Sequence, residues 1–361
     1  MTIVGADVEA VRLALRRPLT TARGAITARE TFLLRLKAED GAYGEGEAAP
    51  AYWIGEGSLT ATETALRGIV ARVADRPSID ELRAWWARGR ELDGAAACAL
   101  DAALVDLAAR RARVPACALL AADEAVSVPA ALPVAALVGG CDAEALATAV
   151  DGALAAGFTT VKLKIGDGSL ADDRERVDAI RERAGTTVAL RLDANRAWTA
   201  EEARRALAAF APAAPAFVEE PLRDSDPRAL AELARTSGVA IAVDESVAGP
   251  VDLERLLDAD ARVHVVLKAG RVGGPTRLVA LARRARAAGM PVIVTDGIEG
   301  AVGTGVAVHA AAAIGTRLAV GLGGVQLVDA LAAFRGPWVR PSGLGFAIAV
   351  ATGAEPQVAH G

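Results

Sequence analysis

Residues 159–165 read TTVKLKI, and this stretch decides the fold. Its apolar residues alternate with Lys162 and Lys164, so a strand here places the apolar side chains on one face and both lysines on the other. An isolated Lys-x-Lys strand is typical of a solvated sheet edge. The segments on both sides indicate a buried parallel sheet instead, and in such a sheet both lysines point into the interior.

Strand-like runs and helical runs alternate around this stretch. Short runs of β-forming residues are separated by amphipathic stretches of about ten residues or more. Repeated strand, helix, strand units build a parallel sheet, and eight of them are what a closed barrel requires. We therefore predict the α/β class, with a modified TIM-type (β/α) barrel. Its strands are expected at 134–138, 159–165, 188–194, 216–221, 239–245, 263–269, 291–297 and 318–323.

The beginning of the chain has a different pattern. Alternating runs with a turn signal at Asp40–Gly41 predict a small antiparallel sheet, and helical spacing follows over residues 58–122. Sheet followed by helices predicts an α+β domain over 1–125, next to a barrel domain over 126–330. The last segment, 331–361, is expected to pack back on the first domain.

The composition is typical of a globular protein with more than one domain. The chain has 361 residues, of which 53% are hydrophobic and 24% charged, and a formal net charge of -5. Because Lys and Arg are not clustered, nucleic acid is not an expected partner. The three cysteines lack zinc or disulfide spacing, and no secretory signal or membrane-spanning run is recognised. We expect a cytoplasmic protein that does not bind a membrane.

Acidic side chains end three consecutive predicted strands. Asp193, Glu219 and Asp244 lie about 25 residues apart, one β/α unit each, at the strand ends that share the mouth of a barrel. Three carboxylates without His or Cys suit a hard cation, so we predict a site for Mg²⁺ or Mn²⁺. One such acid alone is more often a solvated strand end or a helix cap. Glu220 and Glu245 are rival ligands, although alternation lets only one of each neighbouring pair face inward.

Two lysines are predicted to face each other across this mouth. Lys268 ends the strand at 263–269, four strands round the barrel from Lys164. Removal of a proton α to a carboxylate creates an enediolate, whose extra negative charge a divalent ion stabilises. The base must be neutral, and crowding by Lys162 and a cation disfavours the charged form of Lys164. The pattern predicts α-proton abstraction from a small carboxylate substrate.

In order and spacing, the motifs KLKIG, RLDAN, VEEP, VDES and VVLKAGRVGG resemble those of the muconate-lactonizing subgroup of the enolase superfamily. The resemblance covers nearly the whole chain. It implies that Lys164 and Lys268 form the acid/base pair. It also implies that Mg²⁺ is bound by the three strand-end acids, Asp193, Glu219 and Asp244.

The resemblance places further residues around this centre. Lys162 and Asn195 match supporting positions of the family, and two acids near the end of the strand at 291–297, Asp296 and Glu299, are expected to join them. The first domain matches a capping domain whose loops, around 20–24 and 49–57, close over the substrate. The expected substrate contacts in these loops are Arg23, Tyr52 and Trp53.

The motifs leave the reaction open. Dipeptide epimerases usually carry Asp-x-Asp on the eighth strand, where this chain has VGLGGVQL without an acid. Residues 295–315 and the Gly-Leu-Gly that follows look like those of o-succinylbenzoate synthases, and 299–304 is a run shared with muconate cycloisomerases. We expect the synthase reaction, a syn dehydration. An N-acylamino acid racemase, a dipeptide epimerase, a muconate cycloisomerase and a carboxylate-binding barrel without turnover are the alternatives, and a homo-oligomer is expected.

Overall fold

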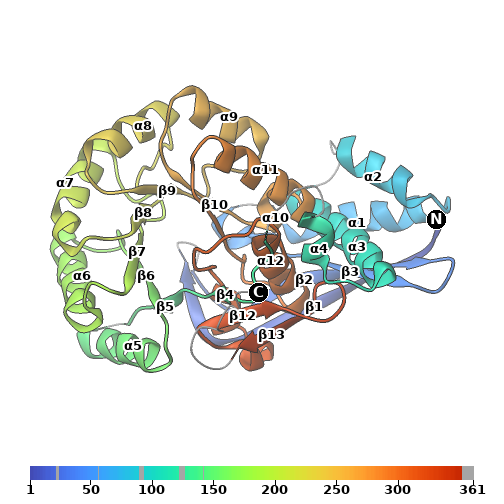
Figure 1. The fold of residues 1–361 in the computed structure, drawn as a ribbon, viewed down its shortest axis with the longest axis horizontal. Helices are drawn as coiled ribbons and strands as arrows, with labels where there is room; N and C mark the ends of the chain where they lie inside the picture. The colour runs from blue at the N-terminus through green and yellow to red at the C-terminus, as the bar shows by residue number, and fades with distance from the viewer. Residues whose placement is uncertain (22–23, 56, 89–92, 122–126, 141, 352–361) are drawn as a thin grey trace.

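An N-terminal α+β domain lies beside a curled parallel sheet that is surrounded by helices (Figure 1). This computed structural model describes residues 1–21, 24–55, 57–88, 93–121, 127–140 and 142–351. Within these ranges, no helix combines the length and the apolar character that crossing a membrane requires. The α/β class and the modified barrel that the sequence predicted are confirmed.

The N-terminal domain is an antiparallel sheet of order β1-β2-β3 covered by helices. Its elements are β1 (Ile3–Thr21), β2 (Gly24–Ala38), β3 (Tyr43–Ala48), η1 (Tyr52–Ile54), α1 (Leu59–Val73), α2 (Ile79–Arg88), α3 (Gly94–Ala112) and α4 (Ala116–Ala121). Glycines of β3 let α3 pack directly on the strand. A Cβ at Gly44 would lie 2.1 Å from Ala103 O, and one at Gly46 would lie 2.0 Å from Ala99 O.

Within the described residues, seven parallel strands form the barrel, in the order β11-β10-β9-β8-β7-β6-β5. They are β5 (Ala136–Val138), β6 (Thr160–Lys164), β7 (Ala189–Asp193), β8 (Phe217–Glu219), β9 (Ile241–Val243), β10 (His264–Leu267) and β11 (Val292–Val294). The eighth strand, predicted at 318–323, is reduced to parallel bridges from Val320 to Val134 and from Gly321 to Thr295. It ends early because the chain enters a helix at Gly323.

Side chains of the strands separate into two layers. Val161 and Leu163 face the helices and join the main core, as the alternation in β6 predicted, while Phe217 and Ile293 belong to a small cluster inside the barrel. The covering helices are α5 (Ala143–Ala155), α6 (Leu170–Ala184), α7 (Ala200–Phe210), α8 (Pro227–Thr236), α9 (Pro250–Asp258), α10 (Ala269–Val272), α11 (Pro275–Ala287), α12 (Ala301–Ala313) and α13 (Gly323–Leu327). A short turn, η2 (Ala211–Ala213), follows α7.

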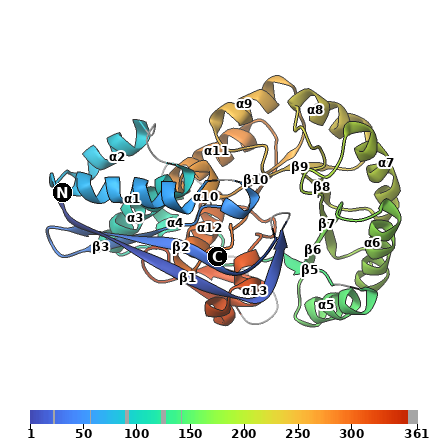
Figure 2. The same cartoon turned by 180° about the vertical axis from the view of Figure 1, so that it is seen from behind.

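The C-terminal segment and the β1–β2 hairpin connect the two parts. The C-terminal segment contains η3 (Asp329–Phe334), β12 (Trp338–Pro341) and β13 (Ile348–Ala351). Strand β12 pairs with β13 and also with β4 (Leu132–Pro133). Phe346 N donates to Asp106 Oδ1 of α3 at 3.2 Å. The hairpin reaches across to the barrel side of the molecule (Figure 2), where Leu15 forms a bridge to Val328. The N-terminal domain therefore contacts the barrel from two directions.

Candidate active site

The carboxyl ends of the parallel strands bring the predicted polar side chains together. In the strand register, Lys164 lies beside Asp193, and Asp193 lies beside Glu219. Asp244 and Lys268 directly follow β9 and β10, so they continue the same series of strand ends. One end of the barrel therefore carries all five residues.

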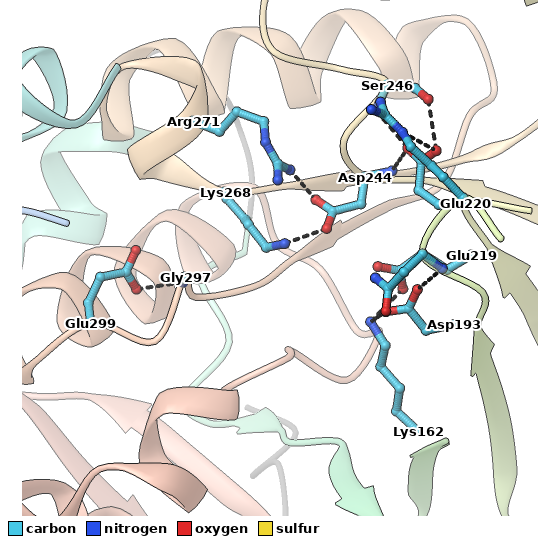
Figure 3. Close-up of polar contacts among 12 residues, drawn as sticks. Lys162, Asp193, Glu219, Glu220, Asp244, Ser246, Lys268, Arg271, Gly297 and Glu299 are labelled. Carbon is cyan, nitrogen blue, oxygen red and sulfur yellow. Dashed lines mark hydrogen bonds and ion pairs between the residues drawn. The ribbon is translucent and has the colours of Figure 1, made fainter. Parts of the chain in front are cut away.

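The Lys162 ammonium group lies between two of the acids (Figure 3). Its Nζ is 2.7 Å from Asp193 Oδ2 and 2.8 Å from Glu219 Oε2. Burial disfavours the charged amine, but the two carboxylates outweigh burial and raise the pKa of Lys162, so it is protonated. Burial first, and then repulsion from Asp193, raise the pKa of Glu219 to about 8. Two acids thus already converge on one cation.

Asp244 is held by a separate pair of cations. Its carboxylate accepts hydrogen bonds from Nζ of Lys268 and from the guanidinium group of Arg271 (Figure 3). Burial opposes ionisation, yet these two cations hold the pKa of Asp244 well below its usual range. For Lys268, burial lowers the pKa, but the attraction of Asp244 outweighs burial and the net shift is upward. Lys268 is therefore protonated as well.

The two rival acids have different surroundings. Glu220 is buried and accepts hydrogen bonds from the backbone N of Asp244 at 2.7 Å and of Ser246 at 2.6 Å, so it braces the loop after β9. Glu245 lines a cavity, and burial together with repulsion from Asp244 raises its pKa to about 7. Because β9 ends at Val243, strand alternation does not separate Asp244 from Glu245. Glu220 also lies beyond the end of its strand, β8, so its hydrogen bonds to the loop backbone, and not strand alternation, argue against it as a ligand, whereas Glu245 remains an alternative.

The two predicted catalytic lysines differ in exposure. The Lys164 side chain is 48% exposed, and its Nζ lies 3.7 Å from Asp167, whose side chain is 74% exposed. The Lys268 side chain is only 22% exposed. Both lysines line the same cavity. Lys164 ends β6 and Lys268 follows β10, so three strands, β7 to β9, lie between them. The strand ends that carry the acids therefore separate the two amines.

This cavity has a volume of about 1110 Å³ and lies between the two domains. The N-terminal domain contributes Leu19, Trp53 and Ile54 to its lining. Tyr52 is not among the lining side chains but packs edge-on against Trp53, with ring centroids 5.3 Å apart. Arg23, predicted to contact the substrate, lies outside the described residues. Of the three predicted substrate contacts, the structure places Trp53 in the cavity.

The remaining supporting residues, Asn195, Asp296 and Glu299, also line the cavity. Asp296 Oδ2 accepts a hydrogen bond from Gly324 N at 2.8 Å, and Glu299 Oε2 accepts one from Gly297 N at 2.7 Å (Figure 3). Burial, and after it repulsion from Asp296, raise the pKa of Glu299 to about 8. The raised pKa favours the neutral form of this carboxyl group more than water does, and that form can donate a hydrogen bond.

Sequence reasoning missed three buried arginines around the site, Arg29, Arg191 and Arg271. Arg191 lines the cavity and donates to Ala319 O at 2.8 Å. Its position could have been found, because alternation from Asp193 turns it inward. The short helix α10 carries Arg271 to the acids, and no sequence signal marks Arg29.

The donors suit a divalent cation, although protein cations hold the acids here. Among the described side chains, no three of Asp, Glu, His or Cys are arranged to hold a metal ion directly. Lys162 lies between Asp193 and Glu219, and Asp244 faces its own pair of cations. Hard oxygen donors on consecutive strands, two of them converging on one positive charge, are what Mg²⁺ requires. In chemistry these residues fit that ion, and Asp193 and Glu219 already converge on one positive charge.

Two family models match the chain. The N-terminal domain of the mandelate racemase / muconate lactonizing enzyme family matches residues 3–121. The enolase C-terminal domain-like family matches residues 144–337. The two matches correspond to the N-terminal domain and to the barrel.

Individual relatives agree with the family models. The 3,6-anhydro-alpha-L-galactonate cycloisomerase of Streptomyces coelicolor is 32% identical over 86% of each chain. The o-succinylbenzoate synthase of Thermobifida fusca is 37% identical over 44% of this chain and 49% of its own. The substrate-liganded L-Ala-D/L-Glu epimerase from Bacillus subtilis superimposes with a TM-score of 0.86, at 25% identity, over 97% of this chain and 99% of that one. The resemblance in the motifs is thereby confirmed, and the chain belongs to the enolase superfamily, as an enzyme among its lyases and isomerases.

Proposed function

We propose that the protein removes the proton α to the carboxylate of a small substrate, with Mg²⁺ held by Asp193, Glu219 and Asp244. The observation that carries this proposal is that Lys164 and Lys268 line one cavity from either side of the acidic strand ends. A substrate carbon held between the two amines would present one face to each. Membership of the enolase superfamily supports Mg²⁺ as the ion.

Lys164 is suited to accept the proton. Its ion pair with Asp167 joins two exposed groups over 3.7 Å, and such pairs contribute little. Unlike Lys162, it is not bound to two buried carboxylates, so loss of its proton breaks no strong contact. Its 48% exposed side chain can also exchange that proton with water.

Lys268 is suited to the opposite role. Its hydrogen bond to Asp244 and its raised pKa keep it protonated. A fixed cation at this position stabilises the negative charge that develops on the substrate carboxylate as the proton leaves. Mg²⁺, when bound, would add Lewis-acid stabilisation of the same charge.

For the overall reaction we propose a syn dehydration like that of o-succinylbenzoate synthase. Lys164 takes the α proton and then gives a proton to the hydroxyl group that leaves from the same face, so that water is lost and a C=C bond forms. The likeness to the T. fusca synthase supports this reaction. So does the sequence of Gly321, Leu322 and Gly323, which line the cavity and carry no acidic side chain of their own.

A cycloisomerase is the second candidate, because the S. coelicolor cycloisomerase matches 86% of the chain. The α proton would leave in the same way. The group expelled from the β carbon would be a ring oxygen of the substrate itself, so no water would be lost. In a racemase, by contrast, Lys268 would return the proton to the other face of the same carbon.

Product analysis separates these reactions. The protein is incubated with Mg²⁺ and, in turn, with the cyclohexadiene precursor of o-succinylbenzoate, muconate, N-succinyl amino acids and dipeptides. Loss of one water supports dehydration, an isomer of unchanged mass supports cycloisomerisation, and inversion of a chiral centre supports racemisation. Each activity should disappear in Lys164→Met. Binding without turnover of any compound would contradict the proposal and favour a carboxylate-binding barrel.

A further inference from the structure

A buried arginine of the N-terminal domain contacts one wall of the cavity. Arg29 lies on β2, and its side chain is fully buried. Its Nη2 donates to Ala49 O at 3.0 Å, and its guanidinium carbon lies 3.8 Å from the centroid of the Trp53 ring. One side chain therefore joins β2 to the loop at residues 49–54.

Trp53 is the part of this loop that lines the cavity. It belongs to the short helix η1, which has no fully buried residue, so hydrophobic burial alone holds the helix weakly. Tyr52 packs against the edge of Trp53, and its own ring lies 5.7 Å from the guanidinium carbon of Arg29. A cation–π contact is stronger at a desolvated site than at an exposed one. The stack on Arg29 is therefore a main restraint on the orientation of Trp53.

Stability alone does not account for a buried guanidinium group at this place. Arg29 Nε is buried and has no hydrogen-bond partner among the described residues. Burying a charge is costly, and an apolar side chain of similar volume often serves stability equally well. Two carboxyl groups interact electrostatically with the guanidinium group of Arg29, namely those of Glu299 and Glu47. Glu299 lines the cavity, and Glu47 accepts a hydrogen bond from Gly300 N of the barrel at 2.7 Å.

We propose that Arg29 is a positioning residue, which sets the shape of the substrate pocket by fixing Trp53 against it. This rests on the proposed function in one respect, namely that the cavity is the substrate site. Arg29 need not touch the substrate. Without the contact to Arg29, Trp53 would reorient, and the wall of the pocket that Trp53 forms would lose its defined shape. The contacts of Lys164 would not change, so proton transfer would be affected less.

Three variants test this proposal. Arg29→Met removes the guanidinium group and keeps an apolar side chain, and Arg29→Lys restores a cation above the ring. Arg35→Met is the matched control, because Arg35 lies on the same strand and 5.7 Å from the Tyr43 ring, but its side chain is 51% exposed. Acrylamide quenching of tryptophan fluorescence is compared with that of Trp53→Phe to isolate the Trp53 signal. Thermal unfolding confirms that each variant is folded.

In Arg29→Met, the quenching constant of Trp53 should rise about twofold or more, and the KM for a turned-over carboxylate should rise about 10-fold with kcat changed less than about threefold. Arg29→Lys should recover most of both effects, and Arg35→Met should show neither. Unchanged quenching of Trp53 in folded Arg29→Met overturns the proposal, whatever the activity. If the wild-type protein turns over no carboxylate, the proposed function fails, but the quenching result still decides the role of Arg29.

Discussion

Substitution of Lys162 should mainly lower stability, and substitution of Lys164 should mainly lower activity, although the two residues lie two positions apart on β6. Lys162→Met leaves Asp193 and Glu219 buried without the cation that they share. Removing one partner of a buried ion pair costs about 3–5 kcal/mol. Since the pKa of Glu219 is already raised to about 8, protonation of Glu219 relieves part of this cost, and we expect a loss of about 3 kcal/mol.

Lys164→Met is the matched control for stability. It removes only the exposed pair with Asp167, so the free energy of unfolding should fall by less than about 1 kcal/mol. Both variants are unfolded in urea at pH 8 with EDTA present and followed by circular dichroism. Mg²⁺ should then restore more stability to Lys162→Met than to the wild type, because it replaces the missing positive charge. Equal losses in the two variants, or a larger loss in Lys164→Met, would refute the reasoning.

Three further predictions concern the interface, the pH dependence and the metal. Glu47→Ala should lower the free energy of unfolding by about 3 kcal/mol, because Glu47 accepts two backbone hydrogen bonds at the start of α12; a loss below about 1 kcal/mol in urea unfolding would be inconsistent with that role. Burial raises the pKa of Asp101 from 3.8 to about 6, so the wild type loses stability as the pH rises through this interval. Asp101→Asn does not titrate and should gain up to about 3 kcal/mol relative to the wild type between pH 4 and pH 7, about 2.2 pH units at 1.36 kcal/mol each, whereas a pH-independent difference would speak against it. EDTA should abolish turnover and leave the far-ultraviolet circular dichroism unchanged, and activity that survives chelation would exclude the metal requirement.

The barrel and most of the site could be predicted because they depend on local and regular signals. Alternation in β6 determines that Val161 faces the helices and that Lys162 faces the interior. The spacing of one β/α unit between Asp193, Glu219 and Asp244 places them on neighbouring strand ends, since parallel strands align their carboxyl ends.

Other features depend on contacts that no periodic pattern records. Arg29 and Trp53 meet across two elements of the N-terminal domain, and neither position is marked by spacing. Glu245 reaches the cavity because β9 ends before it, and the end of a strand cannot be located to one residue from propensity. The eighth strand is reduced because the chain turns into α13 at Gly323, although its β-forming residues favour a longer strand.

The most direct test of the central claim is deuterium exchange at the α carbon of a bound carboxylate. In D₂O with Mg²⁺, proton NMR should show loss of the α-proton signal with the wild-type protein. Lys164→Met and Lys268→Met should each slow that loss by about 100-fold or more. A carboxylate that binds with no loss of its α proton, or exchange that continues at the wild-type rate in Lys164→Met, would contradict the account.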